Sequence, residues 1–406
     1  MSEDVVIVGA GHAGGTAAAL LRQYGFAGRI TLVGDEGELP YSRPPLSKAW
    51  LKGDVNAGDL HLKPALFYEQ NSITLCLDQK VEGIDPGRRM LYLASGAMMG
   101  YDQLILATGS RPRRLELENS GCEGIVYLRE MRHAAALKER LTSRCSMVIL
   151  GGGYIGLEVA ATTRQLGINV TVLEREPRLL SRVASQPVAR FLREVHEREG
   201  VTFRFGTLLS RIETRCGRLS RLVLDDGSAL ECDLLLVGIG VLANDELARE
   251  AGLACEQGVV IDGAARTSDP HIYAIGDVAR RRLPGGGVEL RIESVSNALD
   301  QAKQVASAIT GRPVPPAETP WFWSDQYTAR LQIVGLAKPT DTVVVRPAAS
   351  PGGLTVLHLE DQVLRAAEVI NGARDFLLAK RAVAAGRTVA REALELAETP
   401  LSALLA

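Results

Sequence analysis

Two glycine-rich turns of identical spacing constrain the fold of this chain more than any other feature of its sequence. In the first, four apolar residues (VVIV) precede Gly9, Gly11 and Gly14, and a helical run covers residues 15–24. In such a G-x-G-x-x-G turn, one glycine permits the tight bend, one lets the main chain approach a pyrophosphate, and one lets helix and strand pack closely. The N-terminus of the helix adds free N–H groups and a partial positive charge, which suit a diphosphate. The first turn therefore predicts a dinucleotide site.

Acidic residues stand where a nucleotide ribose would need them. The second strand, at 29–33, is followed by Asp35 and Glu36. An acid about 20 residues beyond the first glycine typically binds a ribose hydroxyl in this type of unit. Either residue meets that requirement, and a glycine-rich turn without a ligand remains the alternative interpretation.

The same pattern recurs in the middle of the chain. The apolar run MVIL precedes Gly151, Gly153 and Gly156, an apolar helix follows from Leu157, and the next strand ends at Glu174. A single match of this kind is weak evidence. Two matches, each with its own strand, helix and terminal acid, predict two bound dinucleotides.

The composition limits the other possible function classes. The 406 residues include 46 basic and 48 acidic side chains, a net charge of -2, so bulk nucleic-acid binding is not expected. No apolar run approaches the roughly 18 residues of a membrane span, and no signal peptide is visible. The six cysteines are scattered without metal-ligand spacing. These features predict a cytoplasmic protein with no metal site, no membrane partner and no nucleic-acid partner.

The order of the predicted elements gives the domain organisation. The fold class is α/β, with two Rossmann-like dinucleotide-binding domains of the glutathione-reductase-like type and a C-terminal α+β domain. Residues 1–111 and 243–319 are expected to form the first, discontinuous dinucleotide-binding domain, 112–242 the second, and 320–406 the C-terminal domain. Clustered prolines between 313 and 320 mark the last boundary, and four strands are expected between 331 and 370.

Several longer motifs together resemble one family, the flavoprotein ferredoxin reductases of bacterial cytochrome P450 and Rieske oxygenase systems, which are putidaredoxin-reductase-like. The motifs are GAGHAG, YSRPPLSK, LATGSRPR, GGGYIGLE, TSDPHIYAIGD, RIESVSNALDQA and PWFWSDQ. The resemblance covers essentially the whole chain, and YSRPPLSK and WFWSDQ are its narrowest motifs. It departs from the usual pattern at Ala243-Asn244, where the family often has Pro-Asn.

The resemblance implies FAD on the first turn and NAD on the second. The residues implied for FAD are Gly9, Gly11, Ala13, Gly14, Asp35, Glu36, Arg43, Lys48, Val81, Thr108, Arg129, Asp277 and Val295. The residues implied for NAD are Gly151, Gly153, Tyr154, Ile155, Glu158, Glu174, Arg182 and Gly240. The residues implied to be catalytic are Lys48, Glu158 and Pro45. Taken singly, Asp277 would be read as a turn aspartate, Lys48 as a solvated lysine and Glu158 as an exposed helix charge.

The roles of the catalytic residues follow from the same resemblance. The rigid Pro44-Pro45 pair would form a wall against one face of the flavin ring. Lys48 would lie near flavin N5 and pair with Glu158. The segment from Tyr41 to Lys48 contains no cysteine, so a thiol relay to a disulfide substrate is not available there.

The implied function is NADH-dependent electron transfer through FAD to a [2Fe–2S] ferredoxin that feeds a cytochrome P450 or another oxygenase. Glu174 favours NADH because it would repel a 2′-phosphate, whereas the nearby Arg175, Arg178 and Arg182 leave NADPH open. A rubredoxin or monodehydroascorbate reductase is the nearest alternative enzyme. An NADH-sensing signalling flavoprotein resembling apoptosis-inducing factor is the alternative of another class.

A partner surface is expected near the aromatic motif of the C-terminal domain. Its aromatic candidates are Trp321, Phe322, Trp323 and Tyr327. Its basic candidates are Arg280, Arg281, Arg282, Lys303 and Arg330. Ferredoxins are usually acidic, so exposed basic side chains would steer the encounter.

Overall fold

The computed structural model describes residues 3–142, 145–282, 289–396 and 398–405. These residues form two compact units. Unit 1 contains Met1–Arg43, Asn56–Arg111 and Val241–Glu318, and unit 2 contains Pro44–Val55, Pro112–Gly240 and Thr319–Ala406. The three domain boundaries predicted from the sequence remain a prediction.

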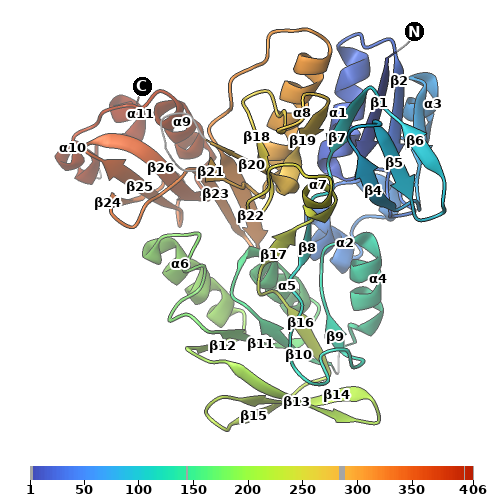
Figure 1. Cartoon of the computed structure of the whole chain (residues 1–406). Coiled ribbons are helices and arrows are strands. Elements are labelled where there is room, and N and C mark those ends of the chain that lie inside the picture. The colour runs from blue at the N-terminus through green and yellow to red at the C-terminus, as the bar shows by residue number, and fades with distance from the viewer. Residues whose placement is uncertain (1–2, 143–144, 283–288, 397, 406) are drawn as a thin grey trace. The chain divides into compact units, whose positions relative to one another are not determined.

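Unit 1 is built on a parallel five-stranded sheet (Figure 1). Its strands, in spatial order, are β19 (Ile272–Ala274), β7 (Gln103–Leu106), β1 (Asp4–Val8), β2 (Arg29–Val33) and β3 (Ile73–Cys76). The central β1 is buried along most of its length because it is an unbroken apolar run, which is typical of a parallel strand covered on both faces. Helices α1 (His12–Gln23) and α8 (Val295–Ile309) pack against each other beside this sheet.

Smaller elements complete unit 1. An antiparallel meander consists of β4 (Val81–Asp85), β5 (Met90–Leu93) and β6 (Met98–Gly100). A second small sheet consists of β18 (Val259–Ile261), β20 (Ala279–Arg282) and β21 (Glu289–Leu290). The remaining elements are η2 (Ala57–Leu60), α3 (Ala65–Gln70), β8 (Ser110–Pro112, at the boundary of the unit), β17 (Val241–Ala243), α7 (Glu246–Glu250) and η3 (Gly276–Val278).

Unit 2 repeats the parallel arrangement. Its first sheet has the order β12 (Thr202–Phe205), β11 (Asn169–Glu174), β10 (Ser146–Leu150), β16 (Leu234–Val237) and β9 (Ile125–Val126). Helices α4 (Met131–Arg140), α5 (Tyr154–Gln165) and α6 (Gln186–Arg198) accompany it, and β13 (Leu209–Arg215), β14 (Arg218–Leu224) and β15 (Ala229–Glu231) form a separate antiparallel sheet. Together with unit 1, this sheet confirms the predicted α/β fold with two Rossmann-like halves.

The C-terminal part of unit 2 is an antiparallel sheet with helices, as expected for an α+β domain. Its strand order is β22 (Trp321–Gln326), β23 (Ala329–Gly335), β26 (Val363–Ile370), β25 (Leu354–Glu360) and β24 (Thr342–Pro347). Helices α9 (Ala373–Ala384), α10 (Arg391–Glu395) and α11 (Leu401–Leu405) follow. The sequence predicted only four of these strands. It missed β22 because consecutive aromatic residues do not alternate with polar ones.

One hydrophobic core joins the C-terminal sheet to the second dinucleotide-binding half inside unit 2. Leu157, Leu179, Leu180, Val188, Ala189 and Leu192 from that half pack together with Ala329, Leu331, Val356 and Ile370 from the sheet. The segment that begins with Pro44 and Pro45 also belongs to unit 2. It forms the 3₁₀ turn η1 (Pro44–Ser47), which is followed by the short helix α2 (Ala49–Lys52).

Candidate functional site

The first glycine-rich turn connects β1 to α1 and has no room for side chains at two of its glycines. Gly9 has a φ of +112°, and a Cβ there would lie 2.2 Å from the Ala107 carbonyl oxygen. A Cβ on Gly14 would lie 2.0 Å from the Gly9 carbonyl oxygen. Gly11, in contrast, is the N-cap of α1 without any side-chain cap, and its nearest neighbour would be an Arg43 nitrogen at 3.8 Å. The free N–H groups of this helix end therefore fit a diphosphate.

Glu36 is the acid that the structure engages beside this turn. The Tyr41 hydroxyl donates to Glu36 Oε2 at 2.6 Å, and Arg43 Nη2 lies 2.6 Å from Glu36 Oε1. Asp35 is exposed. Because Arg43 also reaches over Gly11, it stands at the phosphate end of the turn. His12, the first residue of α1, lies next to this arginine, and its pKa is lowered by burial and by the charge of Arg43.

A second turn of unit 1 packs directly on the first. Gly276 has a φ of +76°, its Cβ position lies 3.0 Å from the Ala13 side chain, and its N–H donates to Gln301 of α8 at 2.6 Å. The next residue, Asp277, accepts a hydrogen bond from the Ser110 hydroxyl at 2.9 Å. The structure thus brings Ala13 and Asp277 together although more than half of the chain separates them.

The remaining residues predicted to bind FAD lie in different surroundings. Thr108 is held by Asn244, whose carbonyl accepts from its hydroxyl at 2.7 Å and whose amide donates back at 2.8 Å. Val81 is buried at the start of β4, and Val295 begins α8. Lys48, Pro45 and Arg129 belong to unit 2.

The second glycine-rich turn connects β10 to α5 and repeats the geometry of the first. Gly151 has a φ of +109°, and a Cβ there would lie 2.3 Å from the Gly238 carbonyl oxygen. Gly153 is the N-cap of α5, has no side-chain cap and has open space where a Cβ would stand. Ile155 leaves 45% of its surface exposed. This helix end therefore also fits a diphosphate.

Glu174, at the end of β11, binds the turn itself. Its Oε2 accepts from the Gly152 N–H at 2.7 Å, and its Oε1 accepts from the Glu176 N–H at 2.9 Å. The carboxylate is therefore fixed beside the turn, where an acid can accept ribose hydroxyls.

The other residues predicted to bind NAD occupy the rim of this turn. Tyr154 donates its hydroxyl to the Val183 carbonyl at 3.0 Å, and burial and the nearby Glu368 raise its pKa. Arg182 is exposed, and Gly240 has a φ of +103° with open space at its Cβ position.

Glu158 contacts three side chains from two other chain segments. Its side chain lies on α5, the residue is 5% exposed, and Lys48 Nζ lies 2.8 Å from Oε2. The Ser47 hydroxyl donates to the same oxygen at 2.6 Å, and the Ser324 hydroxyl donates to Oε1 at 2.7 Å. The expected contact of Lys48 with Glu158 is thus present. Sequence reasoning missed the two serines, although both lie in its narrowest motifs, YSRPPLSK and WFWSDQ, because a motif does not show which of its side chains meet.

The prediction that Arg281 contributes to an exposed basic surface is wrong. This arginine is 4% exposed, and its guanidinium binds Asp300 at 2.9 Å and Gln304 at 2.7 Å. The two partners lie on α8, so the arginine ties β20 to that helix. The side chain of Arg282 lies outside the described residues.

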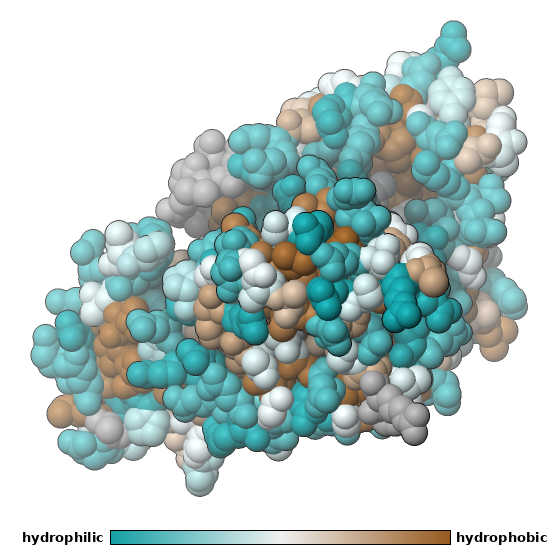
Figure 2. Space-filling view, turned by 90° about the horizontal axis from the view of Figure 1, so that it is seen from below, coloured by the Kyte–Doolittle hydropathy of each residue, from teal (hydrophilic) through white to brown (hydrophobic). Residues whose placement is uncertain are grey.

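The cysteines of this chain form no disulfide bonds. All six are free, and burial raises the pKa of Cys232 to about 12. Among the described residues, no group of histidine, cysteine and acidic side chains has an arrangement that holds a metal ion. No helix in the described ranges is long and apolar enough to cross a membrane. On the face shown in Figure 2, hydrophilic side chains predominate and hydrophobic ones form small separate groups.

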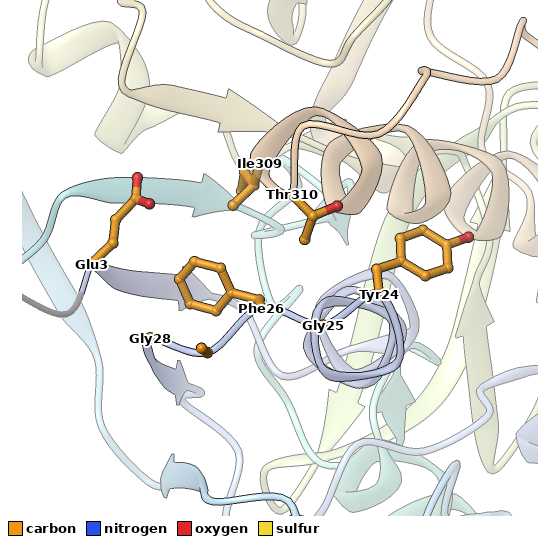
Figure 3. A pocket seen from close by; sticks show the side chains of 8 residues that line it. Glu3, Tyr24, Gly25, Phe26, Gly28, Ile309 and Thr310 are labelled. Atoms are coloured by element: carbon orange, nitrogen blue, oxygen red, sulfur yellow. The ribbon is translucent and has the colours of Figure 1, made fainter.

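A cavity of about 360 Å³ lies at the other end of α1 from the glycine-rich turn (Figure 3). It is lined by Glu3, Tyr24, Gly25, Phe26, Ala27, Gly28, Ile309 and Thr310. None of the predicted site residues lines it.

Comparison with known proteins fits this arrangement. Residues 3–302 match the family described as pyridine nucleotide-disulphide oxidoreductase. The chain belongs to this family. Residues 321–405 match the domain described as reductase C-terminal. Members of the family are oxidoreductases, and the cofactors of this chain are FAD and NAD(P).

Individual relatives agree over nearly the full length. The terpredoxin reductase of a Pseudomonas species is 42% identical over 98% of this chain and 97% of its own. The rubredoxin-NAD(+) reductase of Pseudomonas putida is 43% identical over 90% of this chain and 95% of its own. The reductase in a solved covalent putidaredoxin reductase–putidaredoxin complex has a TM-score of 0.95 and 37% identity, covering 98% of this chain and 97% of that chain.

Proposed function

We propose that this protein is an NADH-dependent ferredoxin reductase that delivers electrons, through FAD, to a [2Fe–2S] ferredoxin serving a cytochrome P450 or another oxygenase. The observation that carries the proposal is the pair of uncapped glycine-rich helix ends, each with its own fixed acid, in a family member without a cysteine between Tyr41 and Lys48. Bound FAD would accept two electrons from NADH and pass them one at a time to the ferredoxin.

In this proposal the first turn and its surroundings hold FAD. Glu36 would accept a ribose hydroxyl, Arg43 would neutralise the phosphates, and Asp277 would bind the ribityl chain. The N–H groups at the start of α1 would complete the phosphate site. The main chain near Val81 would contact the adenine, Arg129 would add a further contact, and the main chain of Val295 would contact the flavin ring.

The second turn would hold NADH. Glu174 is already fixed by two N–H groups, so it can accept ribose hydroxyls without reorganising, and its charge would repel a 2′-phosphate. Arg178 does not offset this repulsion, because its guanidinium is bound to the Leu179, Ser181 and Ala184 carbonyls. Lys48 and Glu158 would position the reacting end of the nucleotide.

The ring contacts of the aromatic residues in and just after β22 support a docking surface smaller than expected. Phe322 packs on Tyr154 at 4.6 Å and Tyr327 packs on His196 at 5.0 Å, so both face the interior of unit 2. Trp321 and Trp323 lie 5.6 Å apart, with Lys380 over the Trp321 ring at 4.7 Å. Trp321 also packs on Phe376 at 6.0 Å and against the C-terminal core, so we assign partner docking to Trp323, with Lys380 and Arg330 as cationic neighbours.

The proposed location is the cytoplasm, because all six cysteines are free and a reducing compartment preserves free thiols.

The test is anaerobic mixing of the holoprotein with NADH and a [2Fe–2S] ferredoxin, with the visible absorbance of the iron–sulfur protein as the signal. We expect rapid ferredoxin reduction that slows as ionic strength rises, and slower reduction with NADPH. Rubredoxin is the rival acceptor, since one relative carries that name. Faster reduction of rubredoxin than of any [2Fe–2S] ferredoxin would contradict the proposal and favour that function.

A further inference from the structure

The carboxylate of Glu158 is held on both of its oxygens. Lys48 and Ser47 contact Oε2 from the η1–α2 segment, whereas Ser324 contacts Oε1 from β22. The Thr162 hydroxyl, one turn further along α5, donates to the Ser47 carbonyl at 2.7 Å. Three chain segments that are distant in sequence therefore meet at one buried carboxylate.

The contact from β22 continues to α6 of the second dinucleotide-binding half. Gln326 Nε2 donates to the Ser324 hydroxyl at 3.1 Å, and Gln326 Oε1 lies 2.9 Å from His196 Nε2. Since this amide oxygen only accepts, His196 carries its proton on Nε2. Burial lowers the pKa of His196 to about 4, which keeps the ring neutral and preserves this arrangement at neutral pH.

Every hydrogen bond in this row points the same way. His196 donates to Gln326, Gln326 donates to Ser324, and Ser324 donates to Glu158. The Ser324 hydroxyl has its acceptor role filled by the Gln326 amide, so its own proton is directed at the carboxylate. The Gln326 amide in the middle of the row does not pass protons between its neighbours. The row fixes orientation.

We propose that Ser324, itself oriented by Gln326, is a positioning residue that holds Glu158 in the geometry required for hydride transfer from NADH. This inference rests on the proposed function and adds the C-terminal domain to the reacting region. Without Ser324, Oε1 loses its protein donor while Lys48 and Ser47 continue to pull Oε2. The carboxylate then turns toward Lys48 and away from its working position.

The chain itself explains why β22 can do this. Side chains alternate along a strand, so Phe322, Ser324 and Gln326 share one face. That face meets the second dinucleotide-binding half at Tyr154, Glu158 and His196 in turn. Because Ser324 and Gln326 are at most 1% exposed, the contact is shielded from competing water.

The experiment compares Ser324→Ala, Gln326→Met and the double variant with the wild-type holoprotein. We expect Ser324→Ala to reduce the rate of flavin reduction at saturating NADH about tenfold, with KM for NADH nearly unchanged. Gln326→Met, which keeps the side-chain volume, should reduce it about threefold. In the Ser324→Ala background it should have no further effect, because Gln326 acts through Ser324.

Readouts other than activity separate positioning from general damage. Crystal structures should show the Glu158 carboxylate displaced in Ser324→Ala, while FAD content and thermal midpoint stay close to wild type. Ser220→Ala is the matched control, since this strand serine donates to a main-chain carbonyl at 3.0 Å.

Three results would overturn the inference: a Ser324→Ala rate within twofold of wild type, an unmoved Glu158, or fully additive effects of the two substitutions. Failure of NADH to reduce the wild-type flavin is a different result, and it would refute the proposed function instead.

Discussion

The two glycine-rich turns have the same backbone but differ in how much protein covers them. Ala13, two residues after the N-cap glycine of the first turn, is 7% exposed, whereas Ile155 at the same place in the second turn is 45% exposed. The segment that follows β2 returns over the first turn and brings Arg43 to it. We infer that the first turn is a closed cradle for a resident cofactor and the second an open one for a nucleotide that is exchanged in each cycle.

The acids beside the two turns differ in the same sense. Glu36 is bound by the side chains of Tyr41 and Arg43, which come from the covering segment. Glu174 is bound by main-chain N–H groups of its own neighbourhood. Glu36 is therefore bound to the segment that covers the first turn. Glu174 is held by main-chain groups beside its own turn, so its orientation does not depend on a ligand.

The largest expected effect comes from Gly9→Ala, which tests the closed cradle. The new methyl group would meet the Ala107 carbonyl at 2.2 Å in a conformation with φ of +112°. We expect a loss of about 3 kcal/mol or more in the free energy of unfolding and little bound FAD. The ratio of flavin to protein absorbance after gel filtration measures this.

Two other substitutions serve as its comparison. Gly58→Ala, with open space at its Cβ position, should keep full FAD content. Gly153→Ala in the second turn has equal space and should keep both fold and FAD. Normal flavin content in Gly9→Ala would show that the first turn does not hold FAD as proposed.

The next effect is the acid sensitivity of unit 2, which contains His196. Burial lowers the pKa of His196 to about 4 in the folded state, whereas an unfolded histidine has a pKa near 6.5. Between these values the unfolded state binds more protons, so stability is complete above pH 6.5 and is lost as the pH falls toward 4. The expected loss from this group is about 3 kcal/mol.

Urea unfolding at several pH values, with His196→Gln as the comparison, measures that loss. The variant should be less stable at pH 7 but lose less between pH 6.5 and 4. Parallel pH curves for the two proteins would show that His196 does not titrate as inferred.

A smaller effect separates the two acids. Glu36→Gln should weaken FAD binding about tenfold and leave the dissociation constant of NADH unchanged, because a charge-assisted contact is lost in one cradle only. Glu174→Gln should do the reverse and also narrow the preference for NADH over NADPH. The dependence of the flavin reduction rate on NADH concentration in stopped-flow mixing, together with the flavin content of each variant, provides the measurement. If each variant weakened the binding of both FAD and NADH, the two acids would not serve separate sites.

The smallest expected effect concerns Arg182 at the open rim. An exposed arginine contributes little through screened charge, so Arg182→Gln should change KM for NADPH by about twofold and KM for NADH by less. Steady-state kinetics at low and high salt measures this. A tenfold change would mean that the second cradle is more closed than its geometry indicates.

The sequence was sufficient for the parts of the site that depend on backbone pattern. The two turns, their strands and helices, and the family followed from glycine spacing and longer motifs, because only glycine fits positions such as Gly9 and Gly151. The choice between Asp35 and Glu36 could not be made, since loop side chains have no periodicity that gives their direction. Glu36 contacts Tyr41 and Arg43 in the structure, which supports our proposal that it is the ribose acid.

Contacts between distant segments were beyond sequence reasoning for the same physical reason. Ser47 and Ser324 lie far apart in the chain. The sequence around a serine does not show that its hydroxyl will bind a buried carboxylate. The burial of Arg281 was equally hidden, because its partners on α8 follow from the packing of that helix. Local patterns fix elements, but only the packed structure fixes which side chains meet.

The hydrophobic core that Leu157 and Leu192 share with Leu331 and Val356 has a consequence for the history of this chain. A domain that buries its own apolar face can be gained, lost or exchanged as a module. Here the C-terminal sheet contributes part of the hydrophobic core that contains residues of α5 and α6. Cutting the chain before β22 would therefore expose apolar side chains of the remaining half to solvent. The C-terminal domain and the second dinucleotide-binding half are therefore expected to fold, exchange amide hydrogens and evolve as one inseparable body.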